Sequence, residues 1–479
     1  MFEYKRTANP KIGVFAIGLA AYWPQFADLY DRLQGYLAHV ERQISQWGEV
    51  VSGGLVDSAE KARAAGAQFA REQVDVVFVH TATYATSSQV LPVVQAAKVP
   101  AIVLNLQPVP ALDYATTTTG EWLANCSACC VPEIASALTR ANLPFKVVSG
   151  TLFDDAAVWT TIREWCQAAK AAHHVRRARL GFLGHTYPGM LDLYADFTAV
   201  HGQLGSHVEV LEIDDLVARV MAVTDREIRD KIGEIRGLFD FAQPASDPIA
   251  APIEPEDLEW SARVAVGLEK LVHDFDLDGL AYYYRGWGGN QNEQVAAAMI
   301  VGNSLLTAQG IPCSGEGDLK NAIAMLVMDR LEAGGSYTEL YAMDFVDGFV
   351  LMGHDGPGHI AISAERPVLR KLKLYHGKRG LGVSVEFKVK LGAVSVLGVT
   401  QRADGRLRFL VAEGESLPGP TFRIGNTNSR VRFSLDPAAF VTRWSEEGPT
   451  HHMALGIGHI GQLVEKVGYL LGVATTQVA

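Results

Sequence analysis

Short apolar segments alternate with amphipathic segments along the first third of the chain, and this alternation limits the available folds more than any other feature. The apolar segments are residues 11–19, 74–81, 100–106 and 144–150. Fully apolar strands that alternate with helices form parallel sheets whose two faces are both covered. The sequence therefore predicts an α/β unit over residues 1–174, which ends in a helix.

The alternation resumes after a basic stretch at residues 173–185, which we interpret as a linker into a new strand. Its elements predict a second parallel α/β unit over residues 175–355. We expect further strands at 208–213, 279–284 and 347–352, and helices near 226–242, 256–275 and 291–309. The segment 241–257 is rich in Pro and Asp, which indicates a surface loop.

From about residue 359 the apolar residues recur with a period of two, in segments such as GVSVEFKVKL and RLRFLV. This pattern is typical of an antiparallel barrel or sandwich. Residues 458–474 return to helical spacing and predict a closing helix. The expected fold is two consecutive α/β units with parallel sheets, followed by a barrel-like antiparallel domain over residues 356–479.

Composition excludes several classes of function. The 479-residue chain has 42 Lys and Arg against 53 Asp and Glu, a net charge of −11, which disfavours nucleic acid and anionic membranes as partners. No window approaches the roughly 20 apolar residues of a membrane span, and the N-terminus has no signal-peptide pattern. Five unevenly spaced cysteines indicate a reducing compartment, so we expect a cytoplasmic protein.

Acidic residues and histidines gather in the segment 310–363, each close to a Gly-rich turn. Glu316 and Asp318 precede a predicted helix, Glu339 follows a second turn, and His354 follows an apolar strand. If these turns lie at successive strand–helix junctions, the side chains converge on one point. Carboxylates with one or two imidazoles suit a hard or borderline divalent ion such as Mn²⁺ or Mg²⁺.

Each of these residues also has a purely structural interpretation. Asp318 stands where a helix N-cap is expected, and capping is the favoured interpretation for it. Glu is a poorer cap, and the flanking glycines favour a functional role for Glu316. For His354, a satisfied polar residue and a metal ligand are the two alternatives.

Two further segments carry candidate polar groups. His451 and His452 lie in a short loop after the β-rich region, and they either face solvent or contribute to a distant site. Arg285 and Trp287 end a predicted strand in YYYRGWGG. An Arg beside a flat indole suits a polyol, and the alternative is an aromatic core with an Arg at its rim.

The order and spacing of these segments resemble the L-fucose isomerase / L-arabinose isomerase superfamily, and most closely an L-arabinose isomerase-like protein. The likeness covers most of the chain and is sharpest in EGDLKNAIAMLVMDRLEAGGSYTE. The resemblance implies that Glu316 and Glu339 bind Mn²⁺, or another divalent ion such as Mg²⁺ or Co²⁺, and act as catalytic acid and base. It adds His354, from FVLMGH, and His452, the second member of the His pair, as the other ligands.

An N-terminal motif departs from the family pattern. The family sequence N-Q-x-A-H corresponds to NCSAC here, with Cys126 in place of Gln and Cys129 in place of His. Thiols hydrogen-bond more weakly than an amide or an imidazole, so we expect a substrate other than L-arabinose. In the family this loop contacts the sugar of a neighbouring subunit, which implies a homotrimer or homohexamer with shared active sites.

The resemblance implies an aldose–ketose isomerase that acts on an open-chain pentose, hexose or deoxy sugar through an enediol. The residues expected to line the sugar pocket are Arg285, Trp287, Cys126, Cys129 and His359. Whether Asp344 takes the place of Glu339 is open. Two other functions also stay open: a non-catalytic sugar-binding or regulatory protein, and a divalent-metal sugar epimerase or aldolase.

Overall fold

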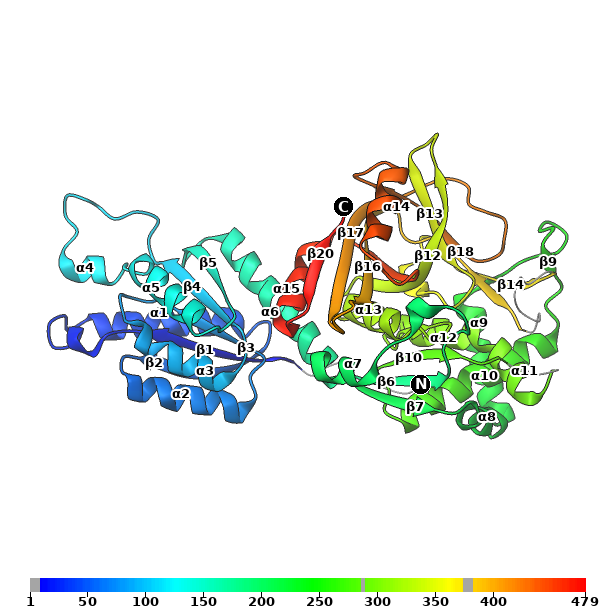
Figure 1. Ribbon diagram of the computed structural model, residues 1–479, viewed down its shortest axis with the longest axis horizontal. Coiled ribbons are helices and arrows are strands. Elements are labelled where there is room, and N and C mark those ends of the chain that lie inside the picture. The colour runs from blue at the N-terminus through cyan, green and yellow to red at the C-terminus, as the bar shows by residue number, and fades with distance from the viewer. Residues whose placement is uncertain (1–8, 286–288, 374–381) are drawn as a thin grey trace. The chain divides into compact units, whose positions relative to one another are not determined.

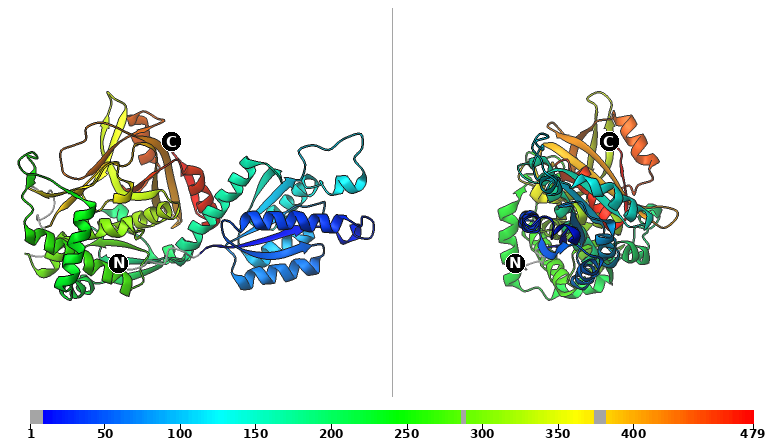
Figure 2. Two further views of the ribbon diagram at one scale, coloured as in Figure 1. Left: turned by 180° about the vertical axis from the view of Figure 1, so that it is seen from behind. Right: turned by 90° about the vertical axis from the view of Figure 1, so that its left-hand side faces the viewer.

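The computed structural model describes residues 9–285, 289–373 and 382–479, which form two compact units (Figures 1 and 2). One unit ends at His173, and the other begins at His174. Trp287, a predicted sugar-binding residue, lies outside the described residues. No helix among the described residues is long and apolar enough to cross a membrane.

The N-terminal unit contains a parallel sheet with the strand order β2-β1-β3-β4-β5. The strands are β1 (Lys11–Ile17), β2 (Glu49–Val56), β3 (Val76–His80), β4 (Ala101–Gln107) and β5 (Phe145–Thr151). The apolar pattern predicts all of them except β2. That edge strand is interrupted by Ser52, Gly53 and Gly54, so it lacks the continuous apolar run of a central strand.

Helices cover both faces of this sheet (Figure 1). They are α1 (Leu29–Ile44), α2 (Ala59–Glu72), α3 (Leu91–Ala97), α5 (Val131–Arg140) and α6 (Ala156–Arg177), whereas α4 (Thr119–Leu123) lies in the long loop after β4. Phe69 of α2, Val93 of α3 and Ile134 of α5 pack with Phe15 and Val79 of the sheet in one core. The cysteine-containing loop lies between α4 and α5, with Cys126 buried and Cys129 exposed.

The second unit begins with another parallel sheet, of strand order β11-β10-β6-β7. Its strands are β6 (Arg179–Gly184), β7 (His207–Leu211), β10 (Gly279–Tyr283) and β11 (Cys313–Ser314). The helices around it are α7 (Phe197–Leu204), α8 (Ile213–Met221), α9 (Asp225–Leu238), α10 (Pro255–Asp274), α11 (Gln291–Ala297), α12 (Met299–Ala308) and α13 (Leu319–Arg330). The helix predicted at 291–309 is therefore two helices, which meet at Ala298.

Antiparallel strands then close into a six-stranded barrel, in the order β16-β19-β12-β13-β18-β17 and back to β16. They are β12 (Gly334–Asp344), β13 (Phe349–His354), β16 (Gly392–Gln401), β17 (Leu407–Leu417), β18 (Thr427–Phe433) and β19 (Met453–Ile457). Beyond α14 (Pro437–Glu446), helix α15 (Gly461–Leu471) confirms the predicted closing helix. It packs against β17 and β20 (Ala474–Gln477), as Figure 2 shows from behind.

These sheets confirm the predicted fold class, with one correction. The strand predicted at 347–352 for the parallel sheet is β13, which pairs antiparallel with β12 and β18 in the barrel. All six of its residues are buried, so its composition matches that of a parallel strand. The predicted loop at 241–257 also contains part of β8 (Asp240–Phe241) and all of β9 (Ala250–Ala251), which pair with β14 (Val368–Leu372) beside β15 (Ser384–Glu386).

Candidate metal centre

A tight turn after β11 carries Glu316 at the carboxyl edge of the central sheet. The Gly317 N–H donates to the Tyr282 carbonyl at 2.9 Å, and the Tyr187 N–H donates to the Glu316 carbonyl at 2.9 Å. Glu316 itself has φ of 59°, a conformation that is uncommon for a side chain of this size. A Cβ on Gly317 would lie 2.6 Å from the His185 carbonyl oxygen. The turn is thus held between the ends of β6 and β10.

Asp318 combines the expected N-cap with a second contact. Its Oδ1 accepts the Asn321 N–H at 2.9 Å, which confirms the cap of α13. Its Oδ2 lies 3.0 Å from Nδ1 of His452. Because a carboxylate only accepts hydrogen bonds, Nδ1 is the donor to Asp318, and Nε2 is the ring nitrogen on the side away from Asp318. Both side chains are fully buried.

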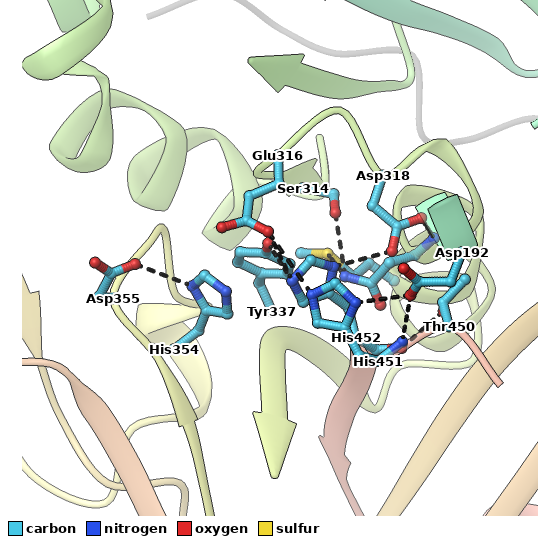
Figure 3. Close-up of polar contacts among 12 residues, drawn as sticks. Asp192, Ser314, Glu316, Asp318, Tyr337, His354, Asp355, Thr450, His451 and His452 are labelled. Atoms are coloured by element: carbon cyan, nitrogen blue, oxygen red, sulfur yellow. Dashed lines mark hydrogen bonds and ion pairs between the residues drawn. The ribbon is translucent and has the colours of Figure 1, made fainter. Parts of the chain in front are cut away.

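The barrel supplies the opposite wall of the site (Figure 3). On β12, Tyr337 and Glu339 are two residues apart and so share one face of the strand. The Tyr337 hydroxyl is 2.8 Å from His452 Nε2, and its ring centroid is 3.9 Å from that of His354 on β13. The Nδ1 of His354 lies 3.4 Å from Asp355 Oδ1.

The four predicted ligands fall into two neighbouring groups that share His452. One donor atom each from Glu339, His354 and His452 lie within 4.8 Å of one another, and so do donor atoms from Glu316, His451 and His452. His452 belongs to both groups, which links them into one cluster. Two carboxylates and two or three imidazoles form a donor set that fits a hard or borderline divalent cation. The described residues therefore include groups able to hold such an ion.

The cluster also perturbs the ionisation of its members. Burial alone would raise the pKa of Glu316, but the imidazoles of His451, His452 and His354 outweigh it and hold that pKa well below the usual range. Burial would lower the pKa of His452, yet Asp318 and Glu316 raise it to about 9. Burial raises the pKa of Glu339. Two carboxyl groups in unlike environments are typical of a functional site.

The other predicted residues that the structure describes belong to neither candidate donor group. Arg285 is exposed just after β10. His359 is buried beside Asp329 at the C-terminal end of α13, with Nε2 3.8 Å from Oδ1, whereas Glu316 precedes the N-terminal end of that helix. Cys126 and Cys129 belong to the N-terminal unit. The sugar-binding roles of these residues stay predictions.

Asp344 does not lie where it could replace Glu339. It ends β12, and its Oδ1 accepts the N–H groups of Val346 and Asp347 in the β12–β13 turn. It lies five positions after Glu339, which faces His354 and His452. The structure thus gives Asp344 a turn-forming role.

Three contributing side chains are missing from the predicted site. Tyr337 is two residues before Glu339, so the period of a strand was a usable signal for it. Of the His pair, the family resemblance predicts only His452 as a ligand, whereas His451 also contributes a donor atom. Asp192 binds His451 from a loop 259 positions away in the sequence, and no local pattern indicates that pairing.

Comparisons with known proteins show which sugar isomerases this chain is similar to. Residues 195–334 match the model of the L-arabinose isomerase central domain. The chain is 23 % identical to a sulfoquinovose isomerase from Alkalicoccus urumqiensis, over 72 % of this chain and 74 % of that protein. It is 24 % identical to L-arabinose isomerase 1 from Bacillus licheniformis, over 66 % of this chain and 62 % of the relative. These matches confirm the predicted resemblance of this chain to the L-arabinose isomerases.

The matches cover only part of several relatives, which limits the conclusions about this chain. The chain spans less than two thirds of the L-arabinose isomerases from Bacillus licheniformis and from Acidothermus cellulolyticus, the latter 25 % identical with 64 % of its length matched. Among solved structures, an ABC transporter solute binding protein from Actinobacillus succinogenes with bound D-allose is 13 % identical. It has a TM-score of 0.17 and coverage of 64 % of this chain and 78 % of that one, so it supports no conclusion.

Proposed function

We propose that this protein is a metal-dependent aldose–ketose isomerase that acts on an open-chain sugar. The observation that carries the proposal is the cluster of Glu316, Glu339, His354 and His452, whose donor atoms come together from the Glu316 turn, β12, β13 and the loop before β19. The sugar isomerases among the relatives support the same reaction class.

These four side chains would hold a divalent cation, with Mn²⁺ as the favoured ion because mixed carboxylate and imidazole sites suit it. When bound, such an ion supplies Lewis acidity towards the oxygen atoms of the sugar. Asp318 contributes indirectly, since it fixes the ring of His452 with Nε2 directed into the site. A carboxylate that holds the second nitrogen of a ligating His is a regular feature of metal centres.

The chain's own carboxylates would move the protons. In the aldose-to-ketose direction, Glu339 removes the proton from C2 and returns it to C1, so the C2–H bond breaks and a C1–H bond forms. Glu316 transfers the proton between the two neighbouring oxygen atoms. The roles reverse in the opposite direction, as microscopic reversibility requires. The two carboxyl groups differ in environment, which suits a division of these tasks.

The substrate loop and assembly follow from the family resemblance. We propose that the loop with Cys126 and Cys129 reaches the active site of a neighbouring subunit, in a homotrimer or homohexamer. The two thiols favour a sugar other than L-arabinose, and Arg285 would face its hydroxyls. The names of the relatives make L-arabinose and sulfoquinovose the first sugars to compare.

The direct test measures ketose formation from a panel of pentoses, hexoses, deoxy sugars and sulfoquinovose. We expect product with added Mn²⁺, loss of product after chelation, and loss in Glu316→Gln. An epimerised or cleaved product would assign the protein to the epimerases or aldolases. Sugar binding without turnover in the Mn²⁺-loaded protein would assign it to the non-catalytic binding proteins.

A further inference from the structure

The loop after β6, residues 185–194, is hydrogen-bonded to three separate parts of the candidate centre. The Tyr187 N–H donates to the carbonyl of Glu316 at 2.9 Å. The buried ammonium group of Lys320, on α13, donates to the Tyr194 carbonyl at 2.7 Å. Asp192 binds the loop before β19 through His451. A connection held at three points is a wall of the site and not a freely moving surface loop.

The contact between Asp192 and His451 involves both the main chain and the side chain (Figure 3). Asp192 Oδ2 accepts the His451 backbone N–H at 3.0 Å and lies 2.7 Å from Nδ1 of the ring. Since an ionised carboxylate only accepts, Nδ1 is the donor. The other nitrogen, Nε2, then lies 3.7 Å from Glu316 Oε2.

The ring of His452 is also held by a carboxylate at Nδ1, so the two histidines can be compared directly. Asp318 binds Nδ1 of His452, and Nε2 lies 3.4 Å from Glu316 Oε2. The difference is exposure: His452 and Asp318 are fully buried, whereas the side chains of His451 and Asp192 are 35 % and 37 % exposed. His452 also has a donor atom in both candidate donor groups, and His451 in one. His451 therefore stands on the side of Glu316 that solvent and a sugar can reach.

We propose that Asp192 is a positioning residue, which holds His451 so that its Nε2 hydrogen-bonds an oxygen atom of the bound sugar beside Glu316. This inference rests on the proposed function and adds a residue that the metal cluster does not require. A carboxylate that orients a functional imidazole through the second ring nitrogen is a recurrent device.

The experiment compares Asp192→Ala, Asp192→Asn, His451→Ala and the Asp192→Ala/His451→Ala double variant in the full-length protein. Asp196→Asn is the matched control, since Asp196 lies just beyond the same loop as the N-cap of α7 and Asn caps equally well. Three quantities are measured: kcat and KM for the aldose found in the panel, the Mn²⁺ affinity by calorimetry, and Tm.

We expect Asp192→Ala to lower kcat by about 10-fold or more, as second-shell losses of this kind do. Mn²⁺ affinity should stay within about 3-fold of the wild type, because His451 is not needed to hold the ion. Asp192→Asn, which keeps an acceptor oxygen, should recover part of the loss. The double variant should be no slower than His451→Ala, because residues that act as a unit are not additive.

Three results would overturn the inference while leaving the proposed function intact. They are unchanged kcat in Asp192→Ala, a double variant whose loss equals the product of the single losses, and a fall in Mn²⁺ affinity or Tm that accounts for the lost activity. A wild-type protein that binds Mn²⁺ but converts no sugar of the panel would instead overturn the proposed function, and this inference with it.

Discussion

At the scale of single residues, Asp318 has two roles that substitutions can separate. It caps α13 through Oδ1 and holds His452 through Oδ2. Asp318→Asn keeps a good N-cap but removes the carboxylate, so Mn²⁺ affinity should fall by about 10- to 100-fold with little change in Tm. Asp318→Ala should also lose about 1 kcal/mol of cap stability. Calorimetric titration and thermal unfolding check both, and equal Mn²⁺ affinity in Asp318→Asn and wild type would contradict the second role.

His80 provides a prediction for the N-terminal unit. It is fully buried at the end of β3, and burial lowers its pKa to about 4. In the unfolded chain, His80 takes up a proton near the ordinary histidine pKa of about 6.5. The contribution of His80 to the free energy of unfolding is therefore fully present above that pH and is lost as the pH falls towards 4. The loss should reach about 3 kcal/mol.

The measurement for His80 is the Tm of the unit between pH 7.5 and 4.5. His80→Phe removes the titrating group and should flatten the pH dependence. Replacing His207, which belongs to the other unit, should leave the pH dependence of this unit unchanged. A wild-type Tm that does not fall faster with acid than that of His80→Phe would contradict the assignment.

Residues whose role depends on their neighbours in the sequence are the ones that the sequence predicts best. The spacing of Glu316, Glu339, His354 and His452 could be matched to a family motif, and the structure brings those side chains together. Asp318 was predictable as a cap because its position before a helix is a local property. The pairing of Asp192 with His451 was not, because it depends on the packing of two distant loops.

At the scale of secondary-structure elements, the spacing between β13 and β18 positions His354. A Cβ on Gly353 would overlap the carbonyl oxygen of Thr427 on β18. Gly353→Ala should therefore push the strands apart, displace the neighbouring His354, and cost about 1–3 kcal/mol. We expect a lower Tm together with at least a roughly 10-fold loss of Mn²⁺ affinity.

The control for Gly353 is Gly202→Ala on α7, where an added Cβ meets no atom within 4 Å. That substitution should be neutral or stabilise the helix by up to about 1 kcal/mol. Unchanged Mn²⁺ binding in Gly353→Ala would show that the strand spacing does not set the position of His354.

Strands with a continuous apolar run can be predicted from the sequence. The sheet to which such a strand belongs cannot, because it depends on the partner strands. The buried strands β1, β3 and β4 follow directly from continuous apolar runs. Strand β13 is equally apolar, and its sequence does not say whether its partners are parallel or antiparallel. The long amphipathic pattern at 291–309 likewise hides the break between α11 and α12.

At the scale of the whole molecule, the proposed sharing of active sites predicts a defined oligomer. Light scattering should give about three or six times the 51.9 kDa mass of one chain. Shared sites also predict complementation between two inactive variants. Glu316→Gln disables the donor cluster, and Cys129→Arg places a bulky cation on the exposed cysteine of the loop.

Mixed oligomers of these two variants should regain activity, because some sites then combine an intact cluster with an intact loop. Oligomers of either variant alone are the control and should stay inactive. A monomeric protein with full activity, or mixed oligomers without recovery, would contradict the sharing of sites.

The most direct measurement is a calorimetric titration of the metal-free protein with Mn²⁺, repeated on Glu316→Gln, Glu339→Gln, His354→Gln and His452→Gln. If these four side chains form one centre, the wild type binds one ion per chain, and each substitution weakens that binding by about 10-fold or more. The loss of ketose formation should follow the loss of bound ion. A wild type that binds no Mn²⁺, or variants that all bind it as tightly as the wild type, would contradict the existence of this centre.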